Sequence, residues 1–284
     1  MSTPKEFIPK MDFGVSHLHK NRITMRLDKF LSESSIERRK AIRILIKEGH
    51  VKVNGQTETI PATEINEHRD VIEYLNEVIP YKENVYYMFH KPSGCVTARS
   101  DKKDITVFDY LQNIDYKGLF PVGRLDKDTE GLLLITNDGM FNHQLMYPDK
   151  HVEKTYFFWA FGTLNSAQIH TLETGILIQP EAPITRPAKI RISKEGFFSE
   201  FKQEIDSFID EKSKRNNSFQ SVLAGFITIS EGRKHQVKRM LKACGCHIFY
   251  LKRISIGDVM LDETLQPGKY RELTKAELES LSSN

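Results

Sequence analysis

The stretch from Gly123 to Gly139, GRLDKDTEGLLLITNDG, constrains the fold of this chain more than any other segment. Its apolar run, Leu132–Ile135, is soon followed by Asn137-Asp138-Gly139, which is typical of a buried strand that ends in a turn. Three acidic residues precede the run at alternate positions, namely Asp126, Asp128 and Glu130. The segment therefore predicts a carboxylate at the entrance to a strand. Residues 122–136, 152–161 and 224–230 are expected as strands of one sheet.

The same acidic residues half-match a calcium-binding loop. Such a loop takes oxygen ligands at its first, third, fifth and often ninth positions, and a bidentate Glu at the twelfth. Counted from Asp126, the ninth position is Leu134 and the twelfth is Asn137, so half of the oxygen ligands are missing. We therefore expect no metal site here. The pair Cys244 and Cys246 lacks the partners that a zinc site needs.

The composition limits the class of protein. With 284 residues, of which 39% are hydrophobic, the chain can form one large core or two domains. Its hydrophobic runs are short and interrupted by charge, so neither a membrane span nor a secretory leader is expected. Three cysteines fit a reducing cytosol better than a disulfide framework, which predicts a cytoplasmic protein. The net charge of +3 is mildly basic, so nucleic-acid binding depends on where the charge lies.

Basic residues cluster first near the N-terminus. Residues 1–24 have little periodicity and several basic side chains, and are expected to form a flexible basic tail. Two short helices, each with one apolar face, follow, then a strand and the hairpin turn Asn54-Gly55. On the second helix, basic residues recur every fourth position: Arg39, Arg43 and Lys47. This stripe is either a solvated helix face or a surface for nucleic-acid phosphates.

A second basic cluster lies near the C-terminus, in EGRKHQVKRMLKACG, residues 231–245. Four apolar residues have the spacing of one buried helical face: Val237, Met240, Leu241 and Cys244. Gly245 is placed to end this helix. Three lysines form a separate stripe: Lys234, Lys238 and Lys242. Such a helix is usually a solvated face, but beside a carboxylate it would favour the ionised form of that group.

These segments resemble two known families in order. The N-terminal part resembles the S4-like RNA-binding domain, whose motif G-x-V-x-V-N-G here spans residues 49–55. From about Asn84 onward the chain resembles the RsuA/RluB-type pseudouridine synthases, bacterial enzymes that isomerise uridine in ribosomal RNA. The matching stretches are HKPSG (90–94), PVGRLDKDTEGLLLITNDG (121–139), HVEKTY (151–156), RPAKI (186–190), EGRKHQVKRML (231–241) and IGDVMLDETLQPGKYRELT (256–274). The HQVKRM segment is more similar to the branch that acts on small-subunit 16S ribosomal RNA.

The resemblance implies a catalytic site. Its invariant Asp corresponds to Asp126, its base-packing tyrosine to Tyr156, and the basic partner of the Asp to Lys238, where many relatives carry Arg. Substrate contacts are expected for Arg124, Lys91, Pro92, Arg233 and Arg239, and for Arg39, Arg43 and Lys47 in the N-terminal helix. Asp128 and Glu130 have no role in the family and are expected at the solvated edge of the loop. No cofactor or metal is implied, and covalent attack and proton abstraction by the Asp both stay open.

The expected protein is therefore α+β. It has a tail at 1–24, an S4-like RNA-binding domain at 25–83 and a pseudouridine synthase domain at 84–284, built on a mixed, mainly antiparallel sheet. An insertion at about 193–221 departs from the family and is expected as a surface helix, a mobile loop or a disordered segment.

The expected activity is the isomerisation of one uridine in 16S ribosomal RNA, by a monomer that acts on free ribosomal RNA or on a ribosomal-subunit assembly intermediate. Three alternatives stay open. The target could lie in 23S ribosomal RNA, or the protein could be an assembly factor that binds ribosomal RNA without chemistry. A hydrolase that uses two carboxylates would instead release free base.

Overall fold

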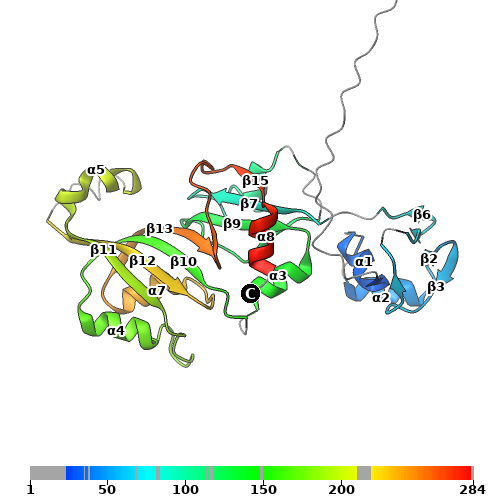
Figure 1. The fold of residues 1–284 in the computed structure, drawn as a ribbon, viewed down its shortest axis with the longest axis horizontal. Coiled ribbons are helices and arrows are strands. Elements are labelled where there is room, and N and C mark those ends of the chain that lie inside the picture. The colour runs from blue at the N-terminus through cyan, green and yellow to red at the C-terminus, as the bar shows by residue number, and fades with distance from the viewer. Residues whose placement is uncertain are drawn as a thin grey trace, which may run out of the picture. The chain divides into compact units, whose positions relative to one another are not determined.

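The computed structural model describes residues 24–282, except 35, 38, 68, 81–83, 113, 115–117, 148–149 and 210–218. The chain divides into two compact units, Met1–Lys82 and Glu83–Asn284, and each has an apolar core of its own (Figure 1). Nearly all of the tail expected at 1–24 lies outside the described residues.

The N-terminal unit contains a helix pair and two small sheets. Its helices are α1 (Leu27–Glu33) and α2 (Arg39–Lys47). Their apolar stripes are buried as predicted, at Leu27, Phe30, Leu31, Ile42 and Ile46. The strands are β1 (Met25–Arg26), β2 (Val51–Val53), β3 (Gln56–Glu58), β4 (Glu64–Ile65), β5 (Ile72–Tyr74) and β6 (Glu77–Val78). Asn54 and Gly55 form the predicted turn between β2 and β3, with φ of 52° and 78°.

A nine-stranded sheet forms the centre of the C-terminal unit, with the main path β11-β12-β10-β13-β9-β7-β15. Its strands are β7 (Tyr86–Lys91), β8 (Phe120–Val122), β9 (Glu130–Thr136), β10 (Lys154–Phe161), β11 (Lys189–Phe197), β12 (Ser221–Ile229), β13 (His247–Ile256), β14 (Val259–Met260) and β15 (Tyr270–Glu272). Among the described pairings of this sheet, β9 with β13 is parallel and the others are antiparallel. The predicted α+β class with a mixed, mainly antiparallel sheet is confirmed.

Strands β10 and β12 confirm two of the three expected strands, but the strand expected over 122–136 is wrong in its first half. β8 ends at Val122 and pairs antiparallel with β9, with Val122 opposite Leu134. Residues 123–129 are therefore the loop of a hairpin. The chain turns at Gly123, whose φ is 72°, and the charged residues that follow would be costly to bury in a central strand.

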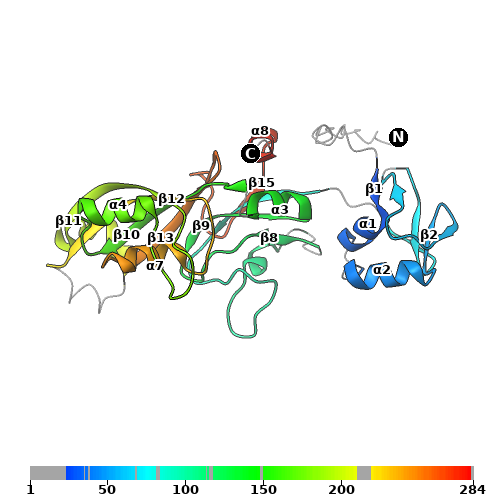
Figure 2. The same cartoon turned by 90° about the horizontal axis from the view of Figure 1, so that it is seen from below.

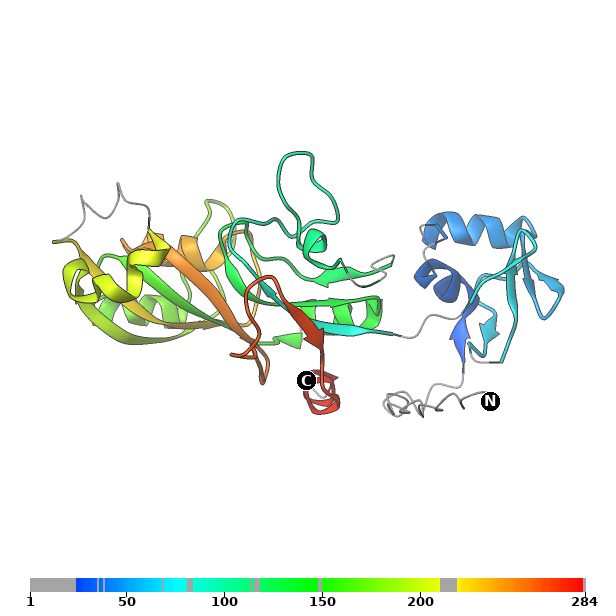
Figure 3. The same ribbon diagram turned by 90° about the horizontal axis from the view of Figure 1, so that it is seen from above.

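Different helices cover the two faces of the sheet. Helices α4 (Ser166–Thr174) and α7 (Gln236–Ala243) lie on the face that contains Phe158, whereas α5 (Lys202–Ile205) lies on the face that contains Trp159. Consecutive side chains of a strand point to opposite faces, which separates these two cores. Figure 2 shows α4 and α7 in front of the sheet, and Figure 3, from the opposite side, shows α5 in front.

The insertion expected at 193–221 is ordered where it is described. Phe198 and Ile205 are fully or almost fully buried, and they pack with Trp159 and Val222 in one core cluster. The expected surface helix is present as α5, whose Lys202, Gln203 and Glu204 are exposed. The alternatives of a mobile loop and of disorder are wrong for residues 198–208, because their apolar side chains close one face of the sheet. The end of the insertion, residues 210–218, lies outside the described residues.

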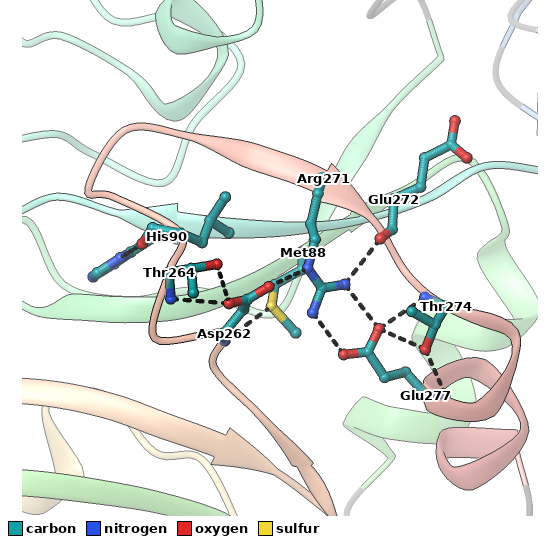
Figure 4. Close-up of polar contacts among 9 residues, drawn as sticks. Met88, His90, Asp262, Thr264, Arg271, Glu272, Thr274 and Glu277 are labelled. Atoms are coloured by element: carbon teal, nitrogen blue, oxygen red, sulfur yellow. Dashed lines mark hydrogen bonds and ion pairs between the residues drawn. The ribbon is translucent and has the colours of Figure 1, made fainter.

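An ion-pair network holds the last helix of the described chain against the sheet. Helix α3 (Gly139–Met146) and helix α8 (Lys275–Ser282) contribute to a further core cluster. Arg271 on β15 lies between two carboxylates, with Nε 2.7 Å from Oδ2 of Asp262 and Nη2 2.8 Å from Oε1 of Glu277 (Figure 4). Hydrogen bonds from Thr264 and Arg271 lower the pKa of Asp262 to about 2. The network therefore stays ionised at neutral pH.

Within the part of the chain that is described, every helix is too short or too polar to cross a bilayer.

Candidate active site

The hairpin loop between β8 and β9 carries Asp126, and a buried lysine holds this loop in place. The side chain of Lys91, at the end of β7, is fully buried. Its Nζ donates to the carbonyl oxygens of Pro92 at 3.0 Å, Lys127 at 3.2 Å and Thr129 at 2.9 Å. Burial lowers the pKa of Lys91. Lys91 was expected to contact substrate, and the structure instead places its ammonium group inside the protein as a brace for the loop.

Two further features position the loop. Thr97 Oγ1 donates to the carbonyl of Leu125 at 2.8 Å, next to Asp126. Gly131, the second residue of β9, has a φ of 110°, and a Cβ there would lie 2.2 Å from the carbonyl oxygen of Arg253. Only glycine therefore lets β9 join β13 directly after the loop. A carboxylate on such a loop is held by main-chain contacts, which suits a catalytic group.

The second side of the site is the turn that leads into α7. This helix begins at Gln236, so Lys234 lies in the turn and is not on a helical stripe as expected. Gln236 Nε2 donates to Oε1 of Glu231 at 2.8 Å, and its Oε1 accepts from the Arg233 amide at 2.8 Å. The Arg233 guanidinium donates to Glu231 and to the carbonyls of Pro183 and Ile184. The structure thus shows Arg233 as an anchor of this turn, whereas a substrate contact was expected.

The Asp126 carboxylate lies between two basic side chains. His235 Nε2 lies 3.5 Å from Oδ1 of Asp126, and Lys238 Nζ lies 3.9 Å from Oδ2. The Asp126 side chain is 30% exposed, so solvent or a ligand can reach it. Sequence reasoning missed His235. It precedes α7 with a φ of 52°, a left-handed conformation that is uncommon outside glycine and often found at functional sites.

Lys238 contacts Asp128 more closely than Asp126. Its ammonium group donates a short hydrogen bond to Oδ1 of Asp128, whereas its distance to Asp126 is 3.9 Å. The Asp128 side chain is largely exposed, as expected for the edge of the loop, but it is not a bystander. Asp128 shares Lys238, which was expected to pair with Asp126 alone. The sequence allows either carboxylate as the partner of Lys238, because both lie within the same short loop.

Glu130 was expected at the solvated edge of the loop, and this is wrong. Its carboxylate is mostly buried and lies 2.9 Å from His90 Nε2 and 3.1 Å from Lys252 Nζ. Tyr250 donates to it at 3.3 Å. Burial raises the pKa of Glu130, but the hydrogen bond from His90 and the charge of Lys252 outweigh this and lower it. The parallel register places Lys252 beside Glu130, so Glu130 anchors the start of β9.

The remaining expected residues lie as follows. Tyr156 is almost fully buried in the core cluster that also contains Leu125 and Val237, the chain neighbours of Asp126 and Lys238. Arg124 is exposed, and Pro92 is partly exposed next to buried Lys91. Arg239 donates to Gln179 Oε1 at 3.4 Å. In the N-terminal unit, Arg39, Arg43 and Lys47 are exposed on α2.

No group of three or more His, Cys, Asp or Glu side chains in the described ranges is arranged as metal ligands. An ionised carboxylate between basic groups can stabilise developing positive charge, attack an electrophilic carbon or accept a proton.

The fold and the site define a two-domain protein. The N-terminal unit carries the basic helix α2, and the α+β C-terminal unit carries the partly exposed carboxylate of Asp126. The chain belongs to the RNA pseudouridylate synthase family, whose model matches residues 85–243, and the S4 domain model matches residues 25–71. Within the family it belongs to the RsuA/RluB group of isomerases that carry an S4 domain.

Similar proteins span nearly the whole chain. The uncharacterized RNA pseudouridine synthase YtzG of Bacillus subtilis is 40% identical over 91% of this chain and 98% of its own length. Ribosomal small subunit pseudouridine synthase A of Haemophilus influenzae is 34% identical, covering 90% and 99%. Ribosomal large subunit pseudouridine synthase B of Bacillus subtilis is 35% identical, covering 90% and 95%. A crystal structure of a pseudouridylate synthase aligns with a TM-score of 0.58 at 34% identity, covering 90% and 99%.

Proposed function

We propose that this protein converts one uridine of ribosomal RNA to pseudouridine, and that the target lies in small-subunit 16S ribosomal RNA. The observation that carries the proposal is the position of Asp126. Lys91 holds the loop that carries Asp126, and His235 and Lys238 flank its carboxylate. Family membership gives the reaction class, and this geometry supports Asp126 as the group that performs the reaction.

The reaction exchanges one base–sugar bond for another. The bond between N1 of uracil and C1′ of ribose breaks, the base turns, and C5 bonds to C1′; C5 loses its proton and N1 gains one. Positive charge develops at C1′ as the first bond breaks. We propose that Asp126 stabilises this charge, attacks C1′ or removes a neighbouring sugar proton. His235 and Lys238 lie 3.5 Å and 3.9 Å from the two oxygens of this carboxylate, where they can orient it toward the sugar.

The target base has to leave its stack before Asp126 can reach the sugar. Extrusion of a base costs a few kcal/mol, which contacts to the flanking backbone and to the extruded base must offset. We propose that the base packs against the edge of Tyr156 that remains accessible, since this ring is almost fully buried in the core. Exposed Arg124 and partly exposed Arg239 offer positive charge for the RNA. We propose that α2 of the N-terminal unit adds phosphate contacts through Arg39, Arg43 and Lys47.

The choice of 16S ribosomal RNA is supported by the start of α7. HQVKRM, residues 235–240, is more similar to the branch that acts on the small subunit. Overall identity does not separate the branches, since the A synthase of Haemophilus influenzae and the B synthase of Bacillus subtilis match almost equally, at 34% and 35%.

Tritium release from uridine-labelled 16S and 23S transcripts tests the proposal. We expect tritium release from the 16S transcript. We also expect that one pseudouridine of 16S ribosomal RNA is absent from the total ribosomal RNA of a deletion strain. Release from the 23S transcript alone would move the target to the large subunit. Binding without release from either transcript or from assembly intermediates would indicate an assembly factor, and free uracil as product would indicate a hydrolase.

A further inference from the structure

A buried carboxylate in the N-terminal unit gathers arginines from three places in the chain. The Asp28 side chain, in the first turn of α1, has 0% exposure. Arg26 donates to its two oxygens through Nε and Nη2, each at 3.0 Å. From α2, Arg39 Nη2 lies 3.0 Å from Oδ1, and Arg43 Nε lies 3.3 Å from Oδ2. We call these four residues the Asp28 cluster.

The positive charge of the cluster exceeds what the buried carboxylate needs. One arginine would neutralise Asp28, whereas three leave a net charge of +2. Burial raises the pKa of Asp28, but hydrogen bonds from Arg26 and Arg39 outweigh it and lower the pKa. The carboxylate is thus ionised at neutral pH. The arginine side chains are 42%, 52% and 57% exposed, so the surplus charge faces solvent.

Holding three arginines around one anion changes how they can bind a second anion. A free arginine side chain loses conformational entropy when it is immobilised. In the Asp28 cluster much of this loss is already incurred on folding. Each guanidinium has five N–H donors in a rigid fork, and the bonds to Asp28 use one or two of them per arginine. The exposed donors can then pair with phosphate oxygens in a fixed arrangement.

We infer that Arg26, Arg39 and Arg43 form one preorganised binding site for RNA backbone phosphates, and that Asp28 is its positioning residue. The inference rests on the proposed function, because it takes ribosomal RNA as the ligand, and it adds Arg26 and Asp28 to the residues already expected. It has an unusual consequence: removal of a negative charge from an RNA-binding surface should weaken RNA binding.

Asp28→Asn in the full chain tests this, with binding to a labelled 16S transcript measured against salt concentration. We expect affinity about tenfold lower at physiological salt and a shallower salt dependence, because fewer phosphates are contacted at once. If net charge alone decides binding, the variant should bind more tightly, and that result would overturn the inference. Glu48→Gln is the matched control, since Glu48 is exposed near the end of α2 and pairs with His50. It makes the same charge change outside the cluster, and its affinity should stay equal or rise slightly.

A second variant decides the matter if Asp28→Asn does not fold, as judged by circular dichroism. Arg26→Lys keeps the charge but loses the two-point contact with Asp28 and the guanidinium fork. Its affinity should fall severalfold, whereas Arg69→Lys, at an exposed position outside the cluster, should change nothing. Unchanged binding by Arg26→Lys would contradict the inference. Absence of salt-dependent binding by the unmodified protein would instead contradict the proposed function.

Discussion

Nε2 of His235, in the turn that leads into α7, lies 3.5 Å from Oδ1 of Asp126, in the β8–β9 loop. The two residues are more than a hundred positions apart in the chain, and the sheet brings them together. The contact places a basic group on one carboxylate oxygen while Lys238 lies near the other. The predictions below follow from this arrangement and from the buried charges near it.

Asp126→Asn keeps the shape of the side chain and removes its charge. We expect turnover to fall by roughly three orders of magnitude or more, as when a nucleophile or an electrostatic group is lost. Affinity for RNA should change little. Asp258→Asn, at an exposed position after β13, is the control and should keep full activity. Single-turnover tritium release measures both, and more than about a tenth of normal turnover in Asp126→Asn would remove its catalytic assignment.

Lys238→Met and Asp128→Asn should change turnover in opposite directions. Without the Lys238 ammonium group, Asp126 loses one of the two basic groups beside its carboxylate, so turnover should fall. Without the Asp128 carboxylate, Lys238 is no longer shared between two acidic groups, so turnover should stay equal or rise. Single-turnover rates measure both changes.

Lys242→Met, on the same helix but exposed, should leave the single-turnover rate unchanged, and Lys238→Arg should be tolerated. Equal rates for Lys238→Met and the unmodified protein would mean that another group, such as Arg239 or Arg124, is the basic partner of Asp126.

His235→Asn tests the residue that the structure adds to the site. Asn tolerates the left-handed backbone of this position, so the turn into α7 should persist while the imidazole is lost. We expect turnover about tenfold lower, which corresponds to about 1.4 kcal/mol of transition-state stabilisation. His170→Asn, an exposed position on α4, should have no effect. Recovery of His235→Gly by added imidazole would show that the side chain, and not the backbone, is what the site requires.

Lys154 should make the stability of the protein depend on pH above neutrality. Burial and the nearby charge of Arg253 lower the pKa of Lys154 to about 8, while an unfolded lysine has a pKa near 10.4. Between these values the unfolded chain binds more protons, so the free energy of unfolding rises with pH. Relative to that of Lys154→Met, the free energy of unfolding of the unmodified protein should rise by about 1.4 kcal/mol between about pH 7 and about pH 9.

Urea unfolding at several pH values measures this difference. Lys202→Met is the control, because Lys202 is exposed on α5 and should add no such dependence. An equal pH dependence in Lys154→Met and in the unmodified protein would contradict the assignment.

Removal of residues 1–83 should weaken binding to ribosomal RNA and flatten its salt dependence, because the phosphate contacts of α2 are lost. The C-terminal unit should still fold, since its core clusters contain only its own residues. Filter binding against salt, with circular dichroism as the folding check, measures the effect. An unchanged salt slope would show that the basic face of α2 is only solvated.

The amino-acid sequence determined those features whose cause is local. The helix pair of the N-terminal unit follows from apolar residues at helical spacing, and the β2–β3 turn from Asn54-Gly55, which accepts positive φ. The burial of α7 follows in the same way from Val237, Met240 and Leu241. Asp126 was predicted as the catalytic group through the resemblance of its motif to the RsuA/RluB-type synthases, because the local pattern alone does not separate it from Asp128 and Glu130.

Only the tertiary structure decided which charges meet. Glu130 and Asp128 look alike in the sequence, yet Glu130 is buried beside Lys252 because β9 and β13 pair in one register, and Asp128 is exposed beside Lys238. Lys91 was predicted to contact substrate, but its ammonium group is buried under the β8–β9 loop. A charged side chain carries no local signal of its partner, since the partner is set by the register of strands far apart in the chain. The sequence therefore determined the local helices and turns and the catalytic candidate Asp126. The packing of the sheet decided which charged side chains lie next to one another.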